Sequence, residues 1–272
     1  MDTALAHTVR RDACPLRRSF VERETSEAPT PLAQLLRTRE DVGGKGGALR
    51  ITLLMTLIWV NARQPYSTSR VAAYWAELLG RDDPHGEGAR AVRDCLHELD
   101  DRGVIQLHSK GPRTEIILRN ESAPFTTDGG PTPYTAPYGV EPYIPVPRAF
   151  WTEGLVAKLS GAGVAMYLCA LALTRTDEHE FFIATQFFEN SFGISRSSRK
   201  RGLAELAEHG VITTRVQEQS MDLVTRRRVR RNVYRLTKTY RLPPAYKAAQ
   251  ETAKDSVDEI IQNLITKHDP KP

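Results

Sequence analysis

The sequence predicts an α+β fold, mainly α, built from two similar halves in tandem. Apolar residues recur at helical spacing in two separate regions, and each region ends in two short segments that predict a β-hairpin. A ten-residue pattern occurs once in each region, near the end of the last helix. Between the regions, residues 121–147 hold seven prolines, so no helix can run through them.

The first half covers residues 46–120. Apolar spacing predicts helices over residues 49–60, 71–79 and 92–99. Strands are expected over 104–107 and 115–118, joined at a tip that contains Gly111 and Pro112. The second half, residues 148–242, repeats this order. Its expected helices cover 162–174, 186–192 and 195–210, and its expected strands cover 181–183, 211–216 and 229–236.

Three further segments flank and join the halves. Residues 1–45 mix charges with threonine, serine and proline and predict a flexible arm. Residues 121–147 predict a semi-rigid linker, in which tyrosines can pack on a neighbouring domain or stack on bases. In the tail, 243–272, one apolar stripe runs along residues 245–266 and predicts an amphipathic helix. That helix could fold back on the chain, but pairing with a second copy as a homodimer is slightly favoured.

The repeated pattern is L-x-E-L-x-x-x-G-V-I, at residues 96–105 and again 107 positions later at 203–212. Two leucines one turn apart bury the end of a helix. The glycine supplies a left-handed cap, and the β-branched pair enters a strand at once. Two occurrences, each followed by an expected hairpin, indicate that the halves share one local architecture.

These residues also carry a family resemblance. The run from Ser195 to Leu203, followed by Leu206 and by Gly210-Val211-Ile212, resembles the recognition helix and first wing strand of winged helix-turn-helix regulators of the GntR and MarR type. Residues 91–96 resemble the same helix in the first half. The match departs from the family at Arg199, where a buried aliphatic is usual, and at Gly88-Ala89, which replace a polar helix start.

The resemblance implies that the third helix enters the major groove of duplex DNA and that the hairpin reaches the flanking backbone or minor groove. If Leu203 and Leu206 face the core, helical spacing places four residues on the opposite, outward face: Arg196, Ser197, Lys200 and Arg201. Arginine suits guanine edges, while serine and lysine suit bases or phosphates. The candidate DNA-contacting residues of this helix are Ser195, Arg196, Ser197, Ser198, Arg199, Lys200 and Arg201.

The second hairpin adds a run of arginines that favours phosphate contact and minor-groove insertion: Arg226, Arg227, Arg228, Arg230 and Arg231. A solvated basic strand edge that deters aggregation is the alternative. Residues 195–241 hold thirteen lysines and arginines against four acidic residues, a net charge of +9. Residues 81–119 hold seven against eight, a net charge of −1. The second half should therefore dominate affinity.

In the first half the equivalent candidates are fewer, and DNA contact and ordinary solvent exposure are equally good interpretations of them. Helical spacing places Arg90, Arg93 and His97 on the outward face of the third helix. Lys110 and Arg113 lie on the hairpin.

The sequence gives little support for a metal site, a disulfide, a nucleotide site or a catalytic site. The three cysteines are far apart and form no zinc or disulfide pattern. Gly43–Gly47 lacks the spacing of a phosphate-binding loop, and the adjacent residues Asp177–Glu180 cannot all point at one metal ion. No catalytic pairing stands out, so we expect no enzyme activity, cofactor or metal. No signal segment or membrane-length apolar run occurs, which predicts a cytoplasmic, nucleoid-associated protein without membrane contact.

The sequence thus predicts a double-stranded-DNA-binding protein, with two functional interpretations close together. A transcriptional regulator, as a repressor, is narrowly favoured because such regulators are common. The alternative resembles plasmid replication initiators, which place two winged-helix domains in one chain and bind repeated origin sequences. A protein-interaction scaffold is a third interpretation, and the basic second hairpin argues against it.

Overall fold

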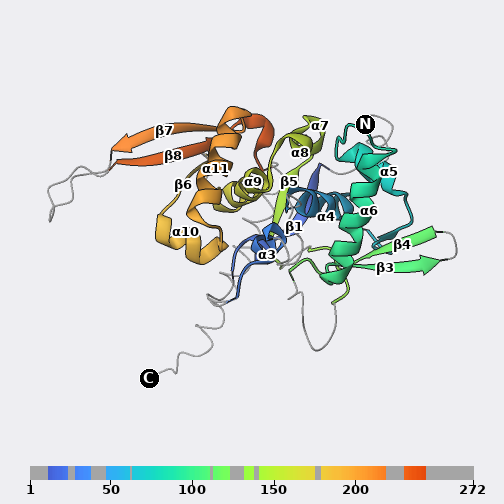
Figure 1. Ribbon diagram of the computed structural model, residues 1–272. Coiled ribbons are helices and arrows are strands. Elements are labelled where there is room, and N and C mark those ends of the chain that lie inside the picture. Colours follow the sequence, from blue (N-terminus) through green and yellow to red (C-terminus); the bar gives the residue numbers. More distant parts are fainter. Residues whose placement is uncertain are drawn as a thin grey trace, which may run out of the picture.

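A computed structural model describes residues 12–23, 28–37, 47–61, 63–110, 113–122, 132–137, 141–174, 179–218 and 230–242. These residues form a mixed α+β structure, as the sequence predicts (Figure 1). None of the helices in these ranges is long and apolar enough to cross a membrane. The expected C-terminal helix, 245–266, lies outside the described residues.

The first unit follows the order helix, strand, helix, helix, strand, strand. Its elements are α4 (Gly47–Asn61), β2 (Ser67–Thr68), α5 (Ala72–Leu78), α6 (Glu87–Asp101), β3 (Ile105–Lys110) and β4 (Arg113–Leu118). The three strands form an antiparallel sheet in the order β2-β4-β3. The short strand β2 was not expected, because two residues are too few to show the alternation of a strand.

The second unit repeats this order and this sheet topology. Its elements are α9 (Gly161–Leu173), β6 (Glu180–Phe182), α10 (Thr185–Phe192), α11 (Arg196–Glu208), β7 (Ile212–Glu218) and β8 (Arg230–Leu236). The sheet order is β6-β8-β7, with the last strand in the middle as in the first unit. A short 3-10 helix, Lys238–Tyr240, follows. The two hairpins extend from opposite ends of the molecule (Figure 1).

The sequence predicts a flexible arm at the start of the chain, but residues 12–23 and 28–37 are ordered and packed. They form β1 (Ala13–Arg17), α2 (Arg18–Val21) and α3 (Pro31–Leu36), and Leu16, Phe20 and Leu32 are fully buried. The apolar residues of this segment are spread over three short elements, so no single periodic pattern marks them.

The strand β1 pairs with β5 (Tyr143–Pro147) in a symmetric antiparallel arrangement, with Pro15 opposite Pro145. Each strand is followed by a short helix, α2 in one case and α7 (Ala149–Thr152) in the other. The backbone amide of Arg18 donates to Pro142 at 3.0 Å, and that of Arg148 donates to Asp12 at 2.9 Å. Both segments read P-x-x-R-x-F, 130 residues apart. The internal repeat therefore includes the segment before each unit.

The described parts of the segment 121–147, where a linker is expected, are packed against β1 and the core. Arg17 Nη1 lies 2.7 Å from Glu121 Oε2, and both side chains are almost fully buried. Arg17 Nε lies 2.6 Å from Glu141, and Tyr134 is buried, so packing holds for this tyrosine. Tyr138 lies outside the described residues. Proline content predicts the absence of a helix, but it does not exclude ordered packing.

One hydrophobic core extends through both units. Helix α4 packs against α9, and α8 (Leu155–Lys158) precedes α9. The rings of Trp59 and Trp151 stack with centroids 4.2 Å apart, and Trp151 Nε1 donates to Thr56 Oγ1 at 2.9 Å. The two units thus meet through a buried interface rather than through a chain connection alone.

Candidate nucleic-acid interface

Helix α11 presents the exposed cationic face that the sequence predicts. Ser195 caps it, because its Oγ accepts a hydrogen bond from the amide of Ser198 at 3.3 Å. Leu206 is fully buried and Leu203 is half-buried, which fixes the rotation of the helix. The candidates that are exposed are Ser195, Arg196, Ser197, Lys200 and Arg201, whereas Ser198 and Arg199 are half-buried.

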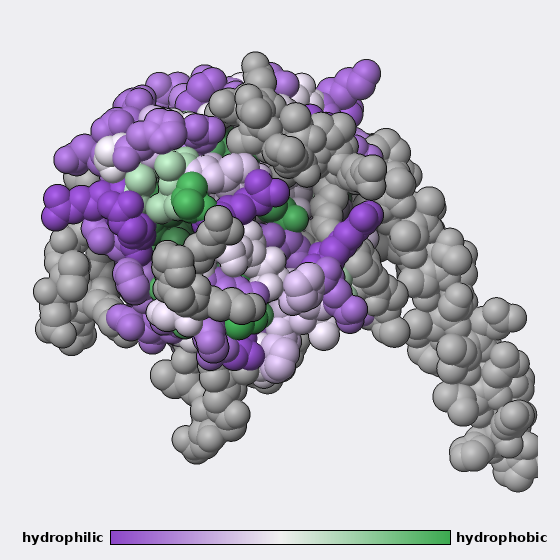
Figure 2. Space-filling view, turned by 90° about the vertical axis from the view of Figure 1, so that its right-hand side faces the viewer, coloured by the Kyte–Doolittle hydropathy of each residue, from purple (hydrophilic) through white to green (hydrophobic). Residues whose placement is uncertain are grey.

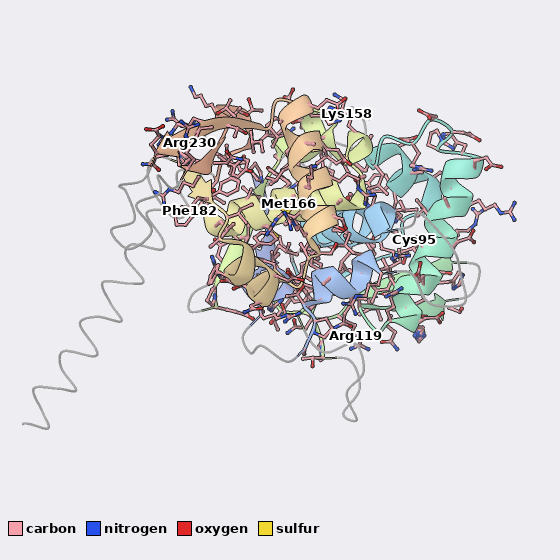
Figure 3. The ribbon with its side chains drawn as sticks, turned by 60° about the vertical axis from the view of Figure 1, so that its left-hand side comes forward. Cys95, Arg119, Lys158, Met166, Phe182 and Arg230 are labelled. Atoms are coloured by element: carbon pink, nitrogen blue, oxygen red, sulfur yellow. The ribbon has the colours of Figure 1, made fainter. Side chains whose placement is uncertain are left out.

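Two features hold α11 tightly against α9. Gly202 faces α9 so closely that a Cβ there would collide with the carbonyl oxygen of Ala162 and with Cγ of Met166, which Figure 3 labels. Glu205, the glutamate of the repeated pattern, accepts from the amide of Ser160 at 3.0 Å and from its Oγ at 2.6 Å. The position of α11 therefore depends on a backbone contact and on a carboxylate that binds the start of α9.

Arg199 has a role that spacing alone did not reveal. Its guanidinium lies 5.6 Å from the ring centroid of Phe188 in α10, within the range of a cation–π contact. Phe188 is buried, so Arg199 joins the two helices of this helix pair. Arg199 is thus half-buried, and its exposed neighbours Arg196, Lys200 and Arg201 are the better candidates for contact with a ligand.

The exposed cations of α11 lie where a helix favours negative charge. The first turn contains no acidic residue, and the helix dipole already places partial positive charge at this end. Among the described residues, no carboxylate lies within ion-pair distance of Arg196, Lys200 or Arg201. Positive charge that no described carboxylate compensates makes the surface suitable for an anionic ligand.

The second hairpin is basic, but two of its described arginines are engaged within it. Arg230 Nη2 lies 3.0 Å from Glu218 Oε1, and both side chains are largely exposed. Arg231 donates to Gln217 at 2.9 and 3.1 Å and covers the ring of Phe182 at 4.4 Å. Figure 3 shows Phe182 and Arg230 at the same end of the molecule, far from Cys95. Arg226, Arg227 and Arg228 lie outside the described residues.

Two cations on this sheet are not among the candidates that the sequence predicts. Arg215 on β7 and Arg235 on β8 are exposed, although both lie on the same face of the sheet as the buried Val233, so strand alternation alone does not identify them. Arg215 Nη2 lies 2.6 Å from Glu180 Oε2 on β6. Hydrogen bonding from Arg215 lowers the pKa of Glu180, so this carboxylate stays ionised and partly offsets the sheet's positive charge.

The first unit has an exposed third helix of mixed charge. Arg90, Arg93 and His97 are exposed on α6, as expected, but Asp94 is exposed on the same helix. The start of α6 is capped from outside, since Asp83 accepts hydrogen bonds from the amides of Gly86 and Glu87 at 3.0 and 2.9 Å. These hydrogen bonds lower the pKa of Asp83.

Where its residues are described, the side of the molecule that carries the first unit is mainly hydrophilic (Figure 2). Lys110 is the last residue of β3, and it is paired in register with Arg113, the first residue of β4.

No cluster that could hold a metal ion occurs within the described ranges. No group of three or more histidine, cysteine, aspartate or glutamate side chains converges there. Asp177 and Glu178 lie outside those ranges, and Glu180 is occupied by Arg215. The three cysteines are buried, and burial raises the pKa of the Cys95 thiol to about 12. A protonated, enclosed thiol is a poor nucleophile.

Comparisons with known proteins return no match to a family model, to a curated protein or to a solved structure.

Proposed function

We propose that the chain is a non-enzymatic, double-stranded-DNA-binding protein with two winged helix-turn-helix units. The repeated element order and the repeated sheet order, with the last strand in the middle, support this proposal because they are those of a winged helix. In that arrangement α6 and α11 are the recognition helices, and the hairpins β3–β4 and β7–β8 are the wings.

The observation that carries the proposal is the exposed start of α11. Arg196, Lys200 and Arg201 project from a helix whose rotation and position are fixed by Leu206 and Gly202. Guanidinium groups bind guanine edges or phosphates, and a rigid helix presents them at the spacing of a major groove. The adjacent basic hairpin adds affinity that does not depend on base sequence.

The biological role that we favour is transcriptional regulation, by repression of promoters. A second candidate is a replication initiator that binds repeated origin sequences. The observation in its favour is that both units share one core within one chain, so a single molecule can contact two adjacent DNA segments. Mapping bound sites in the native genome separates these roles, because promoters imply regulation and direct repeats at an origin imply initiation.

The direct test of DNA binding uses the variant Arg196→Ala/Lys200→Ala and the matched control Lys158→Ala. Lys158 is an exposed cation on α8 that is not part of the candidate interface. The double variant should lose about tenfold or more of its affinity for duplex DNA, while the control stays near wild type. Equal affinities for all three proteins would remove α11 from the interface, and the absence of duplex binding by wild type would favour the scaffold interpretation.

A further inference from the structure

The two helix pairs that the proposed function assigns to DNA are connected by a part of the chain that lies in neither unit. Arg23 and residues 28–37, here called the brace, run from the α10–α11 turn of the second unit to the C-terminal end of α6 in the first. The sequence shows no motif in this segment. Its contacts at both ends are hydrogen bonds to main-chain atoms.

At the second unit, the brace binds the end of α10. The amide of Arg23 donates to the carbonyl of Ser191 at 2.8 Å, and Thr30 Oγ1 donates to the carbonyl of Phe192 at 3.0 Å. Gly193 follows with a φ of +66°, and it forms the turn that leads into α11. The brace therefore holds the turn that sets the direction of α11.

At the first unit, two arginines bind the C-terminal carbonyls of α3. Arg50 donates to Leu35 at 2.8 Å and to Arg37 at 3.1 Å, and Arg102 donates to Gln34 and Arg37, both at 3.2 Å. Cations are favourable at this end of a helix. Glu98 on α6 lies 3.0 Å from Arg50 and 2.8 Å from Arg102, so the brace is tied directly to this recognition helix.

Glu98 and Glu205 are the same residue of the repeated pattern, but they bind different partners. Glu205 binds the N-terminal cap of its own unit's first helix, whereas Glu98 binds the arginines that hold the brace. The symmetry between the units is thus broken at the point where the brace is attached.

We propose that the brace positions α6 and α11 relative to each other and thereby sets the spacing between the two DNA segments that one molecule recognises. Thr30 and Arg102 are its positioning residues. This inference rests on the proposed function, because spacing matters only if both units contact DNA. Its mechanical part, the coupling of the α10–α11 turn to the end of α6, does not depend on DNA.

The first experiment measures spacing dependence in the full-length chain. A bipartite duplex is selected from random sequence with wild-type protein, and one base pair is then inserted between its halves. The insertion should weaken wild-type binding by about tenfold or more, as a mismatched base pair does. Thr30→Val removes the hydrogen bond to Phe192, so this penalty should fall by about threefold to tenfold. Thr30→Ser keeps the hydroxyl and should behave as wild type.

The second experiment measures hydrogen exchange without DNA. Arg102→Ala should speed exchange of the Gly193 amide in the other unit by about threefold to tenfold. Arg81→Ala, which removes an exposed arginine outside the brace, should leave this rate unchanged. Unchanged exchange in Arg102→Ala overturns the brace even if DNA binds. Faster exchange without any duplex binding keeps the brace and rejects the proposed function instead. If the inserted base pair weakens binding of Thr30→Val as much as it weakens binding of wild type, the brace does not set the spacing.

Discussion

Arg196 and Lys200 lie one turn apart on the exposed side of α11, and each can be removed without opening the core. Arg196→Ala should weaken binding by about 1–3 kcal/mol and relax the preference at one base position, if the guanidinium binds a guanine. Binding constants for a set of single-base variants of the selected duplex give this result. A uniform loss across all sequences would reassign Arg196 to a phosphate.

Lys200→Ala should instead reduce affinity for every sequence and lower the salt slope by about one unit, as loss of one phosphate contact does. Thermal unfolding serves as the control, because neither side chain is buried and both variants should melt close to wild type. A large fall in melting temperature would mean that the loss of binding reports unfolding.

Sequence spacing could predict which residues of α11 face outward, since Leu203 and Leu206 fix the rotation of one helix. It could not predict that Arg199 and Arg231 lie over Phe188 and Phe182. Such contacts join side chains from different elements, and their formation depends on packing that a linear pattern does not contain.

Helix α11 can approach α9 only because residue 202 is glycine. In an isolated helix, alanine would be more stable than glycine by about 1 kcal/mol. Here the added methyl group meets the backbone oxygen of Ala162, so Gly202→Ala should destabilise the protein by about 1–3 kcal/mol and weaken DNA binding through displacement of α11. Urea unfolding measures the first effect, with Ala204→Ser on the exposed face as the control. A more stable Gly202→Ala protein would contradict this packing.

The attachment of α6 to the brace should depend on pH. Burial alone would raise the pKa of Glu98, but hydrogen bonds and charges from Arg102 and Arg50 lower it overall. A carboxylate whose pKa is lowered in the folded state stabilises the fold above its ordinary pKa, and this contribution is lost as pH falls through the folded-state pKa.

Acidification from about pH 5 to pH 3 should therefore destabilise wild type more than Glu98→Gln, which has no charge to lose. Urea unfolding of both proteins across this range measures the difference. Parallel losses in the two proteins would show that Glu98 contributes no such dependence.

Most long elements could be predicted, whereas several short ones could not. Helices α4, α6, α9 and α11 lie where apolar spacing places them, and glycines follow the ends of α6 and α11. The strands β1 and β5 become recognisable only as a pair, because each gains its hydrogen bonds from a segment about 130 residues away. The P-x-x-R-x-F repeat was present in the sequence, but it contains too few fixed positions to stand out before the pairing is known.

At the scale of the whole molecule, the shared core predicts cooperative unfolding. The stacked pair Trp59–Trp151 joins the units, while Cys95 lies buried in the first and Cys169 in the second. Tryptophan fluorescence and labelling of both thiols should therefore follow one transition in urea. Two well-separated transitions, with Cys95 and Cys169 exposed at different urea concentrations, would show that the units unfold independently.

The composition of the chain led to a wrong expectation about how the two halves are joined. Proline-rich and glycine-rich stretches commonly join independent domains. Here Arg17 and Glu121 form a buried ion pair that fixes the middle of the chain to β1. An ion pair between residues so far apart in sequence leaves no local signal, so the expectation of a semi-rigid linker differs from the packed segment that the structure contains.

The most direct test of the central claim is the salt dependence of binding between the full-length protein and its selected duplex. The exposed cations of α11 and the net charge of +9 over residues 195–241 predict that several phosphates are neutralised on binding. The logarithm of the association constant should then fall with the logarithm of salt concentration with a slope of about −4 or steeper. A slope near zero, or no duplex binding at physiological salt, would contradict DNA binding through α11.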